Sequence, residues 1–250
     1  MITYSRLGEN GRLGNQLFQY STLFSIAFTR GYELGIPAGC KISEVFELSS
    51  AKEISRTENR PTYVEPSFTF EPNFFLVPDE SNIDGYFQSG NYFRHCQEAL
   101  RKDLRFRECI EEKASDFLRS RLALPICSLH VRRGDYQNLS HYHKNLGSEY
   151  YQVAFDIIRS NVPNAKFLVF SDEPAWCKSV FNDTDIFEIV ETGDDAVDLC
   201  IMSKCHMHVI ANSSFSWWGA WLSASPAVVA PNQWFGAVRK TGRQYTNLVG

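Results

Sequence analysis

The second half of the chain alternates short apolar runs with amphipathic segments of helical spacing. The expected strands cover residues 126–131, 167–170, 187–190, 208–211 and 227–230. The expected helices cover 148–160, 195–205 and 213–223, and a further helix begins at 171–174. Such alternation predicts an α/β fold with a parallel sheet and helices on both of its faces. Because ligands bind these sheets at the carboxyl ends of the strands, the residues directly after the strands are the first candidates for a site.

The beginning of the chain is less regular. A turn punctuated by glycines at 8–14 precedes a segment, 15–29, whose apolar residues have helical spacing. Four prolines within 57–78 exclude a helix interior there, so we expect irregular or edge-strand structure.

Two charged segments with helical spacing follow, at 92–110 and 111–122. The change from this irregular half to the alternating half occurs near 122–125. The sequence therefore predicts two domains, 1–122 and 123–250.

Composition excludes several classes of protein. Lys and Arg total 25 against 29 Asp and Glu, and no basic run stands out, so a nucleic-acid partner is not expected. No segment reaches the roughly 18 apolar residues of a transmembrane helix, and the first residues do not resemble a signal peptide. The seven cysteines form no CxxC pair, which favours reduced thiols and a cytoplasmic location. Peripheral association with a membrane stays open.

Two adjacent arginines follow the strand expected at 126–131. Arg132 and Arg133 precede Gly134 and Asp135 at the edge of the sheet where a ligand would bind. The planar guanidinium group suits bidentate binding of phosphate. A surface ion pair between arginine and aspartate is the alternative interpretation of this segment taken alone.

Polar residues also mark the junction between the strand at 208–211 and the helix at 213–223. Asn212, Ser213 and Ser214 occupy this junction. Such side chains cap helices, and the first backbone amides of a helix also form an anion site. Capping and phosphate binding are both compatible with this sequence.

Asp183 and Asp185 form a DxD triplet, the pattern with which many metal-dependent glycosyltransferases hold a cation. Short triplets of this kind arise often by chance, and this one follows a predicted helix rather than a strand. We interpret it as a solvated turn. The pairs His141/His143 and His206/His208 have no further ligand at the spacing typical of a metal site.

Four ordered motifs together resemble the α-1,2-fucosyltransferase family, glycosyltransferase family 11. They are Gly11-Arg-Leu-Gly-Asn-Gln-Leu-Phe-Gln-Tyr20, Gly85-Tyr-Phe-Gln-Ser89, His130-Val-Arg-Arg-Gly-Asp-Tyr136 and Asn212-Ser-Ser-Phe-Ser-Trp-Trp-Gly219. The resemblance implies a GT-B type fold with two Rossmann-like domains facing a cleft. In that fold 1–122 would be the acceptor-side domain and 123–250 the domain that binds GDP-fucose.

The resemblance further implies inverting, metal-independent transfer of L-fucose from GDP-fucose to the 2-hydroxyl of a galactoside. The expected partners are GDP-fucose and a galactose-terminated oligosaccharide, with no separate cofactor. Arg132, Asp135 and Asn15 are the catalytic candidates that the family pattern implies, and the implied donor-binding residues are His130, Arg132, Asp198, Asn212, Ser213 and Ser214.

Within that pattern, Arg132 would bind the diphosphate and Asp198 the guanine, while Asn15 would approach the transferred fucose. Asp135 and His143 are both candidates for the base. Two other functions stay open: a metal-dependent glycosyltransferase that uses Asp183 and Asp185, and a glycan-binding protein without turnover.

Overall fold

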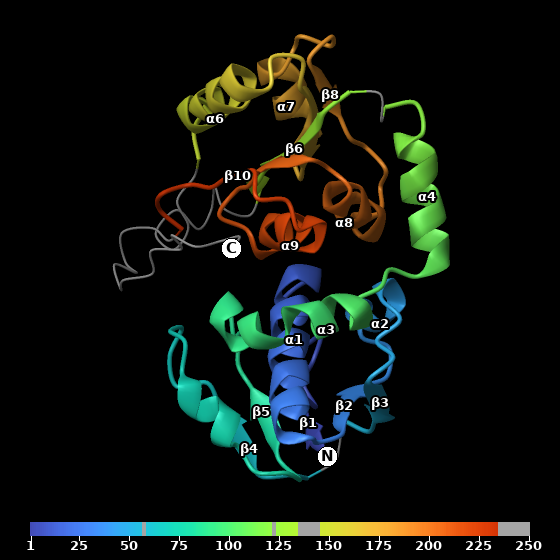
Figure 1. Cartoon of the computed structure of the whole chain (residues 1–250), viewed down its shortest axis with the longest axis vertical. Helices are drawn as coiled ribbons and strands as arrows, with labels where there is room; N and C mark the ends of the chain where they lie inside the picture. Colours follow the sequence, from blue (N-terminus) through green and yellow to red (C-terminus); the bar gives the residue numbers. More distant parts are fainter. Residues whose placement is uncertain (57–58, 122–123, 135–145, 235–250) are drawn as a thin grey trace. The chain divides into compact units, whose positions relative to one another are not determined.

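The computed structural model describes residues 1–56, 59–121, 124–134 and 146–234 (Figure 1). The chain forms two compact units, Met1–Glu108 and Cys109–Gly250. Helix α4 (Glu108–Leu118) therefore lies almost wholly in the second unit, whereas the sequence pattern placed 109–122 before the boundary. Glu111 and Lys113 of α4 form ion pairs with residues of the second unit, Lys204 and Asp194.

The second unit is built on a five-stranded parallel sheet. Its strands are β6 (Ile126–Val131), β7 (Lys166–Ser171), β8 (Phe187–Ile189), β9 (Met207–Val209) and β10 (Val228–Val229). The order across the sheet is β10-β9-β6-β7-β8, and every neighbouring pair is parallel. Counted within this unit and read from β8 to β10, the order is third, second, first, fourth, fifth, as in a Rossmann fold. The expected alternation of strands and helices is confirmed.

Helices cover both faces of this sheet (Figure 1). They are α6 (Ser148–Asn161), α7 (Pro174–Val180), α8 (Asp195–Ser203) and α9 (Ser214–Ser223). One face of β6 presents Cys127, Leu129 and Val131 to a buried core shared with Tyr151 and Ala154 of α6. Since side chains alternate along a strand, Ser128 and His130 point to the opposite face, where α8 packs against α9.

Local sequence explains where these helices begin. Pro174 occupies the first turn of α7, where its missing N–H group is not needed. The Asp194 side chain accepts a hydrogen bond from the Ala196 amide at 3.0 Å and so caps α8.

The first unit also contains a five-stranded parallel sheet, in the order β3-β2-β1-β5-β4. Its strands are β1 (Ile2–Thr3), β2 (Leu34–Pro37), β3 (Ala51–Ile54), β4 (Thr62–Val64) and β5 (Asn82–Asp84). Its helices are α1 (Leu13–Arg30), α2 (Lys41–Val45) and α3 (Gln97–Asp103), with 3-10 turns η1 (Pro72–Leu76), η2 (Gly90–Tyr92) and η3 (Arg94–Cys96). The helix expected at 15–29 is confirmed by α1, and the proline-rich segment supplies the edge strand β4 and the turn η1.

The helix boundary expected at residue 110 is wrong. The chain leaves the helical conformation between α3 and α4, where Phe106 forms an isolated antiparallel bridge with Phe46. Backbone hydrogen bonds from Glu47 to Arg105 and from Arg107 to Val45, both 2.9 Å, fix this extended segment. Helical spacing continues through it in the sequence, but pairing with another segment determines its conformation.

Within the described part of the chain, no helix has the length and apolarity needed to cross a bilayer. All seven cysteines are free thiols, and every one except Cys109 is buried.

The buried side chain of His208 on β9 connects this strand with β6 and with α9. Its Nδ1 lies 2.7 Å from the Ser128 hydroxyl on β6, and its Nε2 lies 2.7 Å from the Ser223 hydroxyl at the end of α9. Burial lowers the pKa of His208 from 6.5 to about 4. The neutral imidazole thus holds α9 in register with the sheet that it covers.

The folded protein resists protonation of His208, whereas the unfolded chain accepts a proton at pH 6.5. The contribution of this side chain is therefore complete above pH 6.5 and is lost as the pH falls toward about 4. We expect the stability difference between the wild type and His208→Asn to shrink by about 1.4 kcal/mol per pH unit in this interval. Urea unfolding at several pH values measures it.

Ser223→Ala is the matched control, because it removes a hydrogen-bond partner but keeps the imidazole. It should lower the free energy of unfolding at every pH and keep the pH slope of the wild type. Parallel pH profiles for the wild type and His208→Asn would contradict the role assigned to His208.

Candidate functional site

Each sheet contains one place where the order of strands reverses. In the second unit the chain runs outward from β6 through β7 to β8 and then returns to β9 on the other side of β6. In the first unit the reversal lies between β1 and β5. Connections leave the sheet in opposite directions at such a point, which opens a crevice beyond the carboxyl ends of the strands. The two reversals therefore mark where ligands are expected.

Arg132 lies directly after β6, at the reversal in the second unit. Its Nη1 is 3.2 Å from Oδ2 of Asp172, which follows the neighbouring strand β7. Asp172 Oδ1 accepts a hydrogen bond of 3.1 Å from the Arg133 amide. A Cβ atom on Gly134 would lie 2.8 Å from Asp172 Oδ2, so glycine allows this carboxylate to approach the backbone. Asp172 thus orients the guanidinium group of Arg132.

Arg133 has different surroundings. Its guanidinium carbon lies 4.1 Å from the centre of the Trp176 ring, and its Nε lies 3.5 Å from Glu173 Oε2. A cation held over an aromatic ring beside a carboxylate contributes to packing. The two adjacent arginines therefore have separate partners.

His130 is buried at the end of β6. Its ring centre lies 5.8 Å from that of Phe215 in the first turn of α9. Burial, together with the charge of Arg132, lowers the pKa of His130 to about 4. Among the residues that the structure describes, its buried Nδ1 atom has no hydrogen-bond partner. A neutral imidazole with one unsatisfied nitrogen at a sheet edge is suited to a hydrogen bond with a ligand.

The polar junction before α9 lies beside β6 at the same reversal, because α9 follows β9. Ser213 is the N-cap residue, but its side chain makes no capping hydrogen bond. The Ser216 hydroxyl turns back to the carbonyl oxygens of Ala211 and Ser213, and Asn212 Nδ2 donates to the Trp234 carbonyl at 3.0 Å. No acidic residue lies in the first turn of α9. The Ser213 side chain therefore does not cap α9, which was one of the two interpretations of this motif.

Asp198 lies on α8, in the segment that follows β8. Its Oδ1 accepts a hydrogen bond of 2.6 Å from the Thr192 hydroxyl. Burial raises the pKa of Asp198 to about 6, and the nearby Asp194 and Asp195 act in the same direction, while the bond from Thr192 opposes them. Near neutral pH the group is a desolvated carboxylate that hydrogen-bond donors would stabilise.

Asn15 belongs to the first unit, in the first turn of α1. Its Oδ1 accepts a hydrogen bond of 2.8 Å from Gln88, so the first two of the four sequence motifs contact each other. Gln19 Nε2 joins them again by donating to the carbonyls of Asn10 and Gly85, both at 3.1 Å.

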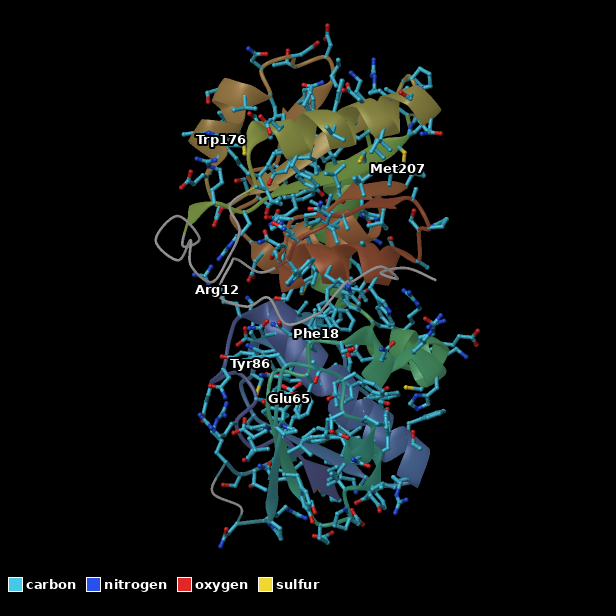
Figure 2. The ribbon with its side chains drawn as sticks, turned by 90° about the vertical axis from the view of Figure 1, so that its left-hand side faces the viewer. Arg12, Phe18, Glu65, Tyr86, Trp176 and Met207 are labelled. Atoms are coloured by element: carbon cyan, nitrogen blue, oxygen red, sulfur yellow. The ribbon has the colours of Figure 1, made fainter. Side chains whose placement is uncertain are left out.

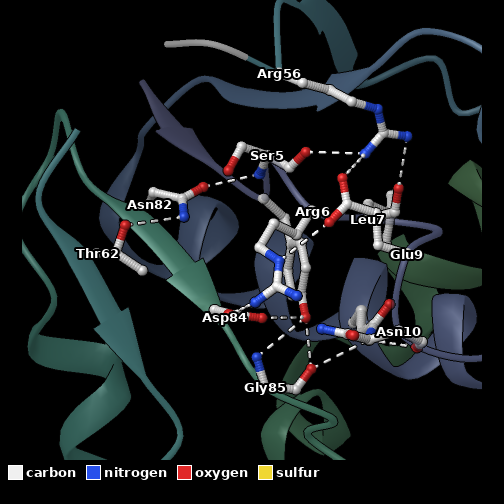
Figure 3. A network of polar contacts seen from close by, with 12 residues as sticks. Ser5, Arg6, Leu7, Glu9, Asn10, Arg56, Thr62, Asn82, Asp84 and Gly85 are labelled. Carbon is white, nitrogen blue, oxygen red and sulfur yellow. Dashed lines mark hydrogen bonds and ion pairs between the residues drawn. The ribbon is translucent and has the colours of Figure 1, made fainter. Parts of the chain in front are cut away.

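A polar network at the reversal of the first sheet surrounds these contacts (Figure 3). The Tyr4 hydroxyl donates to the Gly85 carbonyl at 2.5 Å and accepts from the Gly85 amide at 3.0 Å. Arg6 Nη1 lies 2.8 Å from Asp84 Oδ2. The ends of β1 and β5 are thus held together by paired charges and hydrogen bonds.

The DxD triplet lies at the other edge of the second sheet. Asp183 and Asp185 precede β8, and Asp183 Oδ1 accepts a hydrogen bond of 3.0 Å from the Asp185 amide. The side chain closes a local turn, as the sequence interpretation expected. His206 Nδ1 accepts a hydrogen bond from the Ile126 amide at 3.1 Å. Within the described ranges, no group of three or more His, Cys, Asp or Glu residues could hold a metal ion.

The structure thus brings His130, Arg132 and the 212–214 segment to one edge of one sheet. Asn15 lies in the other unit, and Asp135, His141 and His143 lie outside the described residues. Sequence reasoning missed the orienting residues Asp172, Thr192 and Gln88. Asp172 lies two residues after the expected strand 167–170 and directly after the observed strand β7, so the rule that selected Arg132 also applies to it.

Comparisons with known proteins agree with this arrangement. The family model described as Glycosyl transferase family 11 matches residues 5–247. An alpha-1,2-colitosyltransferase from Escherichia coli is 34% identical over 94% of this chain and 92% of its own. Galactoside alpha-(1,2)-fucosyltransferase 2 from Pongo pygmaeus is 26% identical over 89% of this chain and 70% of its own.

A solved structure shows the same fold. The fucosyltransferase NodZ from Bradyrhizobium superposes with a TM-score of 0.59 over 92% of this chain and 95% of its own, at 14% identity. The expected GT-B type architecture is confirmed by this likeness and by the two parallel sheets. With the family model matched over nearly its whole length, the chain belongs to glycosyltransferase family 11 and is a glycosyltransferase.

Proposed function

We propose that this protein transfers L-fucose from GDP-fucose to the 2-hydroxyl of a galactoside, with inversion at the sugar carbon and without a metal ion. The main supporting observation is the convergence of Arg132, the unsatisfied Nδ1 of His130 and the start of α9 at the β6/β9 reversal. The names of two relatives, a galactoside alpha-(1,2)-fucosyltransferase and an alpha-1,2-colitosyltransferase, support the linkage. NodZ was crystallised with GDP and soaked with GDP-fucose, which supports the donor.

The reaction determines what this edge has to supply. Transfer breaks the bond between the sugar carbon and the β-phosphate oxygen, so negative charge develops on the GDP that leaves. We assign the stabilisation of this charge to Arg132, because its guanidinium group can bind two phosphate oxygens while Asp172 holds it in orientation. Preorganisation of this kind stabilises the transition state without movement of the side chain during the reaction.

Two uncharged groups complete the diphosphate site. The backbone amides at the start of α9 offer hydrogen bonds and the positive end of the helix dipole. His130, with its proton on Nδ1, would donate one further hydrogen bond. Ser213 and Ser214 lie at this helix start and are the predicted phosphate or nucleoside contacts.

Asp198 is the proposed guanine contact. Guanine presents two neighbouring N–H donors on its Watson–Crick edge, and a carboxylate can accept from both, whereas adenine and uracil do not offer that pair. Thr192 fixes the carboxylate through Oδ1 at 2.6 Å. The low solvation that raises the pKa of Asp198 also makes these hydrogen bonds stronger than they would be in water.

The acceptor hydroxyl must lose its proton during transfer, and Asp135 and His143 stay the proposed bases. Asn15, held by Gln88, is the proposed contact to the transferred sugar from the first unit. The DxD triplet lies at the amino edge of β8, away from the carboxyl edge with Arg132, so its position supports a metal-independent reaction.

The colitosyltransferase relative favours a second donor. Colitose differs from fucose by the absence of the 3-hydroxyl group, so both sugars would present the same leaving group to Arg132. The higher identity to this relative, 34% against 26% for the fucosyltransferase, makes GDP-colitose the competing substrate.

Turnover with and without a chelator tests the proposed reaction. The protein is incubated with methyl β-D-galactopyranoside and either GDP-fucose or GDP-colitose, and the product is identified by mass spectrometry and NMR. We expect an α-1,2-linked fucoside at a rate that excess EDTA leaves unchanged. Asp183→Ala and Asp185→Ala should be equally active.

A rate loss greater than about tenfold with EDTA, restored by Mn²⁺, would contradict metal independence. Binding of the galactoside without turnover of either donor would favour the glycan-binding alternative. Formation of a glycoside with GDP-colitose but not with GDP-fucose would identify GDP-colitose as the donor.

The two arginines provide a matched pair of variants. We expect Arg132→Ala to lower kcat by about 10²–10³-fold, since it removes a preorganised donor to developing charge. Arg132→Lys should be nearly as inactive, because an ammonium group cannot form the bidentate contact. Arg133→Ala should be much milder, since Arg133 packs on Trp176.

Kinetics of the three variants, with circular dichroism to verify folding, check this prediction. Near wild-type turnover in Arg132→Lys would reduce the role of Arg132 to a diffuse positive charge. A greater loss in Arg133→Ala than in Arg132→Ala would assign the diphosphate to the other arginine.

A further inference from the structure

We infer that Tyr86 and Phe68 form an aromatic platform in the first unit on which the pyranose ring of the acceptor stacks. The inference rests on the proposed function, since it assigns a place to the second substrate of that reaction. The platform is defined by these two rings and the loop contacts that display them.

The platform lies at the edge of the first sheet where ligands are expected. Phe68 is in the loop after β4, and Tyr86 is in the loop after β5. These two strands are parallel neighbours, so both loops leave the sheet at its carboxyl edge. β5 is also one of the two strands at the reversal of strand order.

Glu65, the first residue after β4, connects its loop with the loop after β5, and its label lies next to that of Tyr86 in Figure 2. Its Oε2 accepts hydrogen bonds from the backbone amides of Tyr86 at 2.8 Å and Phe87 at 2.9 Å. A Cβ atom on Gly85 would lie 2.4 Å from that of Glu65, so only glycine lets the loops approach this closely. A carboxylate that binds two successive amides fixes the direction in which Tyr86 leaves the chain.

The next residue, Phe87, adopts a left-handed conformation with φ 49°. A bulky residue rarely takes this conformation, and the surrounding structure has to compensate for the strain. The ring of Phe87 is fully buried between Phe74 at 5.0 Å and Tyr92 at 5.5 Å, which supplies that compensation. The strained turn sends Phe87 into the core and Tyr86 outward.

The outward rings are the unusual feature. Tyr86 is 36% exposed and Phe68 is 40% exposed, and their ring centres lie 6.0 Å apart at an interplanar angle of 32°. The two rings contact each other in a tilted arrangement, and each exposes part of its apolar surface. Partly exposed aromatic rings of this kind provide contact area with little loss of side-chain entropy.

A galactoside matches such a face. One side of the galactopyranose ring carries a continuous set of C–H groups, while its hydroxyls point to the rim and the other side. Asp84 lies two residues before Tyr86 in the chain and forms an ion pair with Arg6. In this proposal the carboxylate and the guanidinium group provide hydrogen-bond partners for those hydroxyls. An apolar face next to paired charges favours an amphipathic sugar over a purely apolar partner.

The experiment compares Tyr86→Ala, Phe68→Ala and Tyr86→Phe with Phe28→Ala. Phe28 is 57% exposed near the carboxyl end of α1, away from the motif loops, and serves as the matched control for loss of an exposed ring. Initial rates give KM for methyl β-D-galactopyranoside and for GDP-fucose, and saturation-transfer NMR identifies the galactoside protons that contact the protein. Hydrolysis of GDP-fucose without acceptor reports the donor site alone.

We expect the two alanine variants at the platform to raise KM for the galactoside by about tenfold or more. Their KM for GDP-fucose and their donor hydrolysis should match the wild type, and Tyr86→Phe should retain acceptor binding because it keeps the ring. Acceptor KM values no different from those of Phe28→Ala, with donor hydrolysis intact, would overturn the platform and leave the proposed function standing. Absence of GDP-fucose turnover in the wild type would instead overturn the proposed function.

Discussion

Strand β6 has parallel neighbours on both sides, because the chain runs from β6 through β7 to β8 on one side and then returns to form β9 on the other side. The ends of β6 and β9 therefore lie side by side, although their residues are about 80 positions apart in the sequence. Without this reversal, Arg132 and the start of α9 would be unrelated features of two loops. The hydrogen bonds of His208 to Ser128 and Ser223 hold the carboxyl end of α9 against the two strands.

The same edge combines charged and neutral donors in a way that limits the cost of burial. A second cation beside Arg132 would be repelled by it and poorly solvated, and burial accordingly keeps His130 neutral. The neutral ring can still donate a hydrogen bond, as can the amides of α9. Arg132 itself is balanced by Asp172 until an anionic ligand arrives. Arg132, whose charge Asp172 balances, and the uncharged donors of His130 and α9 can therefore bind a diphosphate without a large excess of positive charge. Such a site suits a product that must dissociate after the reaction.

The first unit follows the same rule with different chemistry. Its reversal brings together Tyr4, Gly85 and the Arg6–Asp84 pair, and the nearby loops expose aromatic rings. Balanced charge and apolar area are suited to a neutral sugar more than to a phosphate. The difference between the two edges agrees with separate tasks for the two units.

The second sheet was predictable because its central strands are buried on both faces. Residues 167–170 consequently appear as a continuous apolar run, and 126–131 is mostly apolar and fully buried, with Ser128 and His130 as its polar residues. The strands of the first sheet are shorter than β6 and β7: β1 has two residues, and the edge strand β3 exposes Lys52 and Glu53. Only the resemblance of the four motifs predicted a second Rossmann-like unit.

For the site, the rule that ligands bind after strands selected Arg132 and Ser213 from the sequence. The rule could not show that Asp172 orients Arg132 or that Thr192 holds Asp198, because both contacts depend on how neighbouring segments pack. It also could not separate the roles of Arg132 and Arg133, which differ through the position of Trp176.

Calorimetric titration with GDP, ADP and UDP tests the central claim, a guanine diphosphate site at the edge of the second sheet, most directly. We predict that GDP binds at least about tenfold more tightly than the other two nucleotides, because only guanine offers paired N–H donors to Asp198. Asp198→Asn should abolish that preference, whereas Asp195→Asn, at an exposed position on the same helix, should retain it. Equal affinity of the wild type for all three nucleotides, or an unchanged preference in Asp198→Asn, would contradict the assignment of this edge.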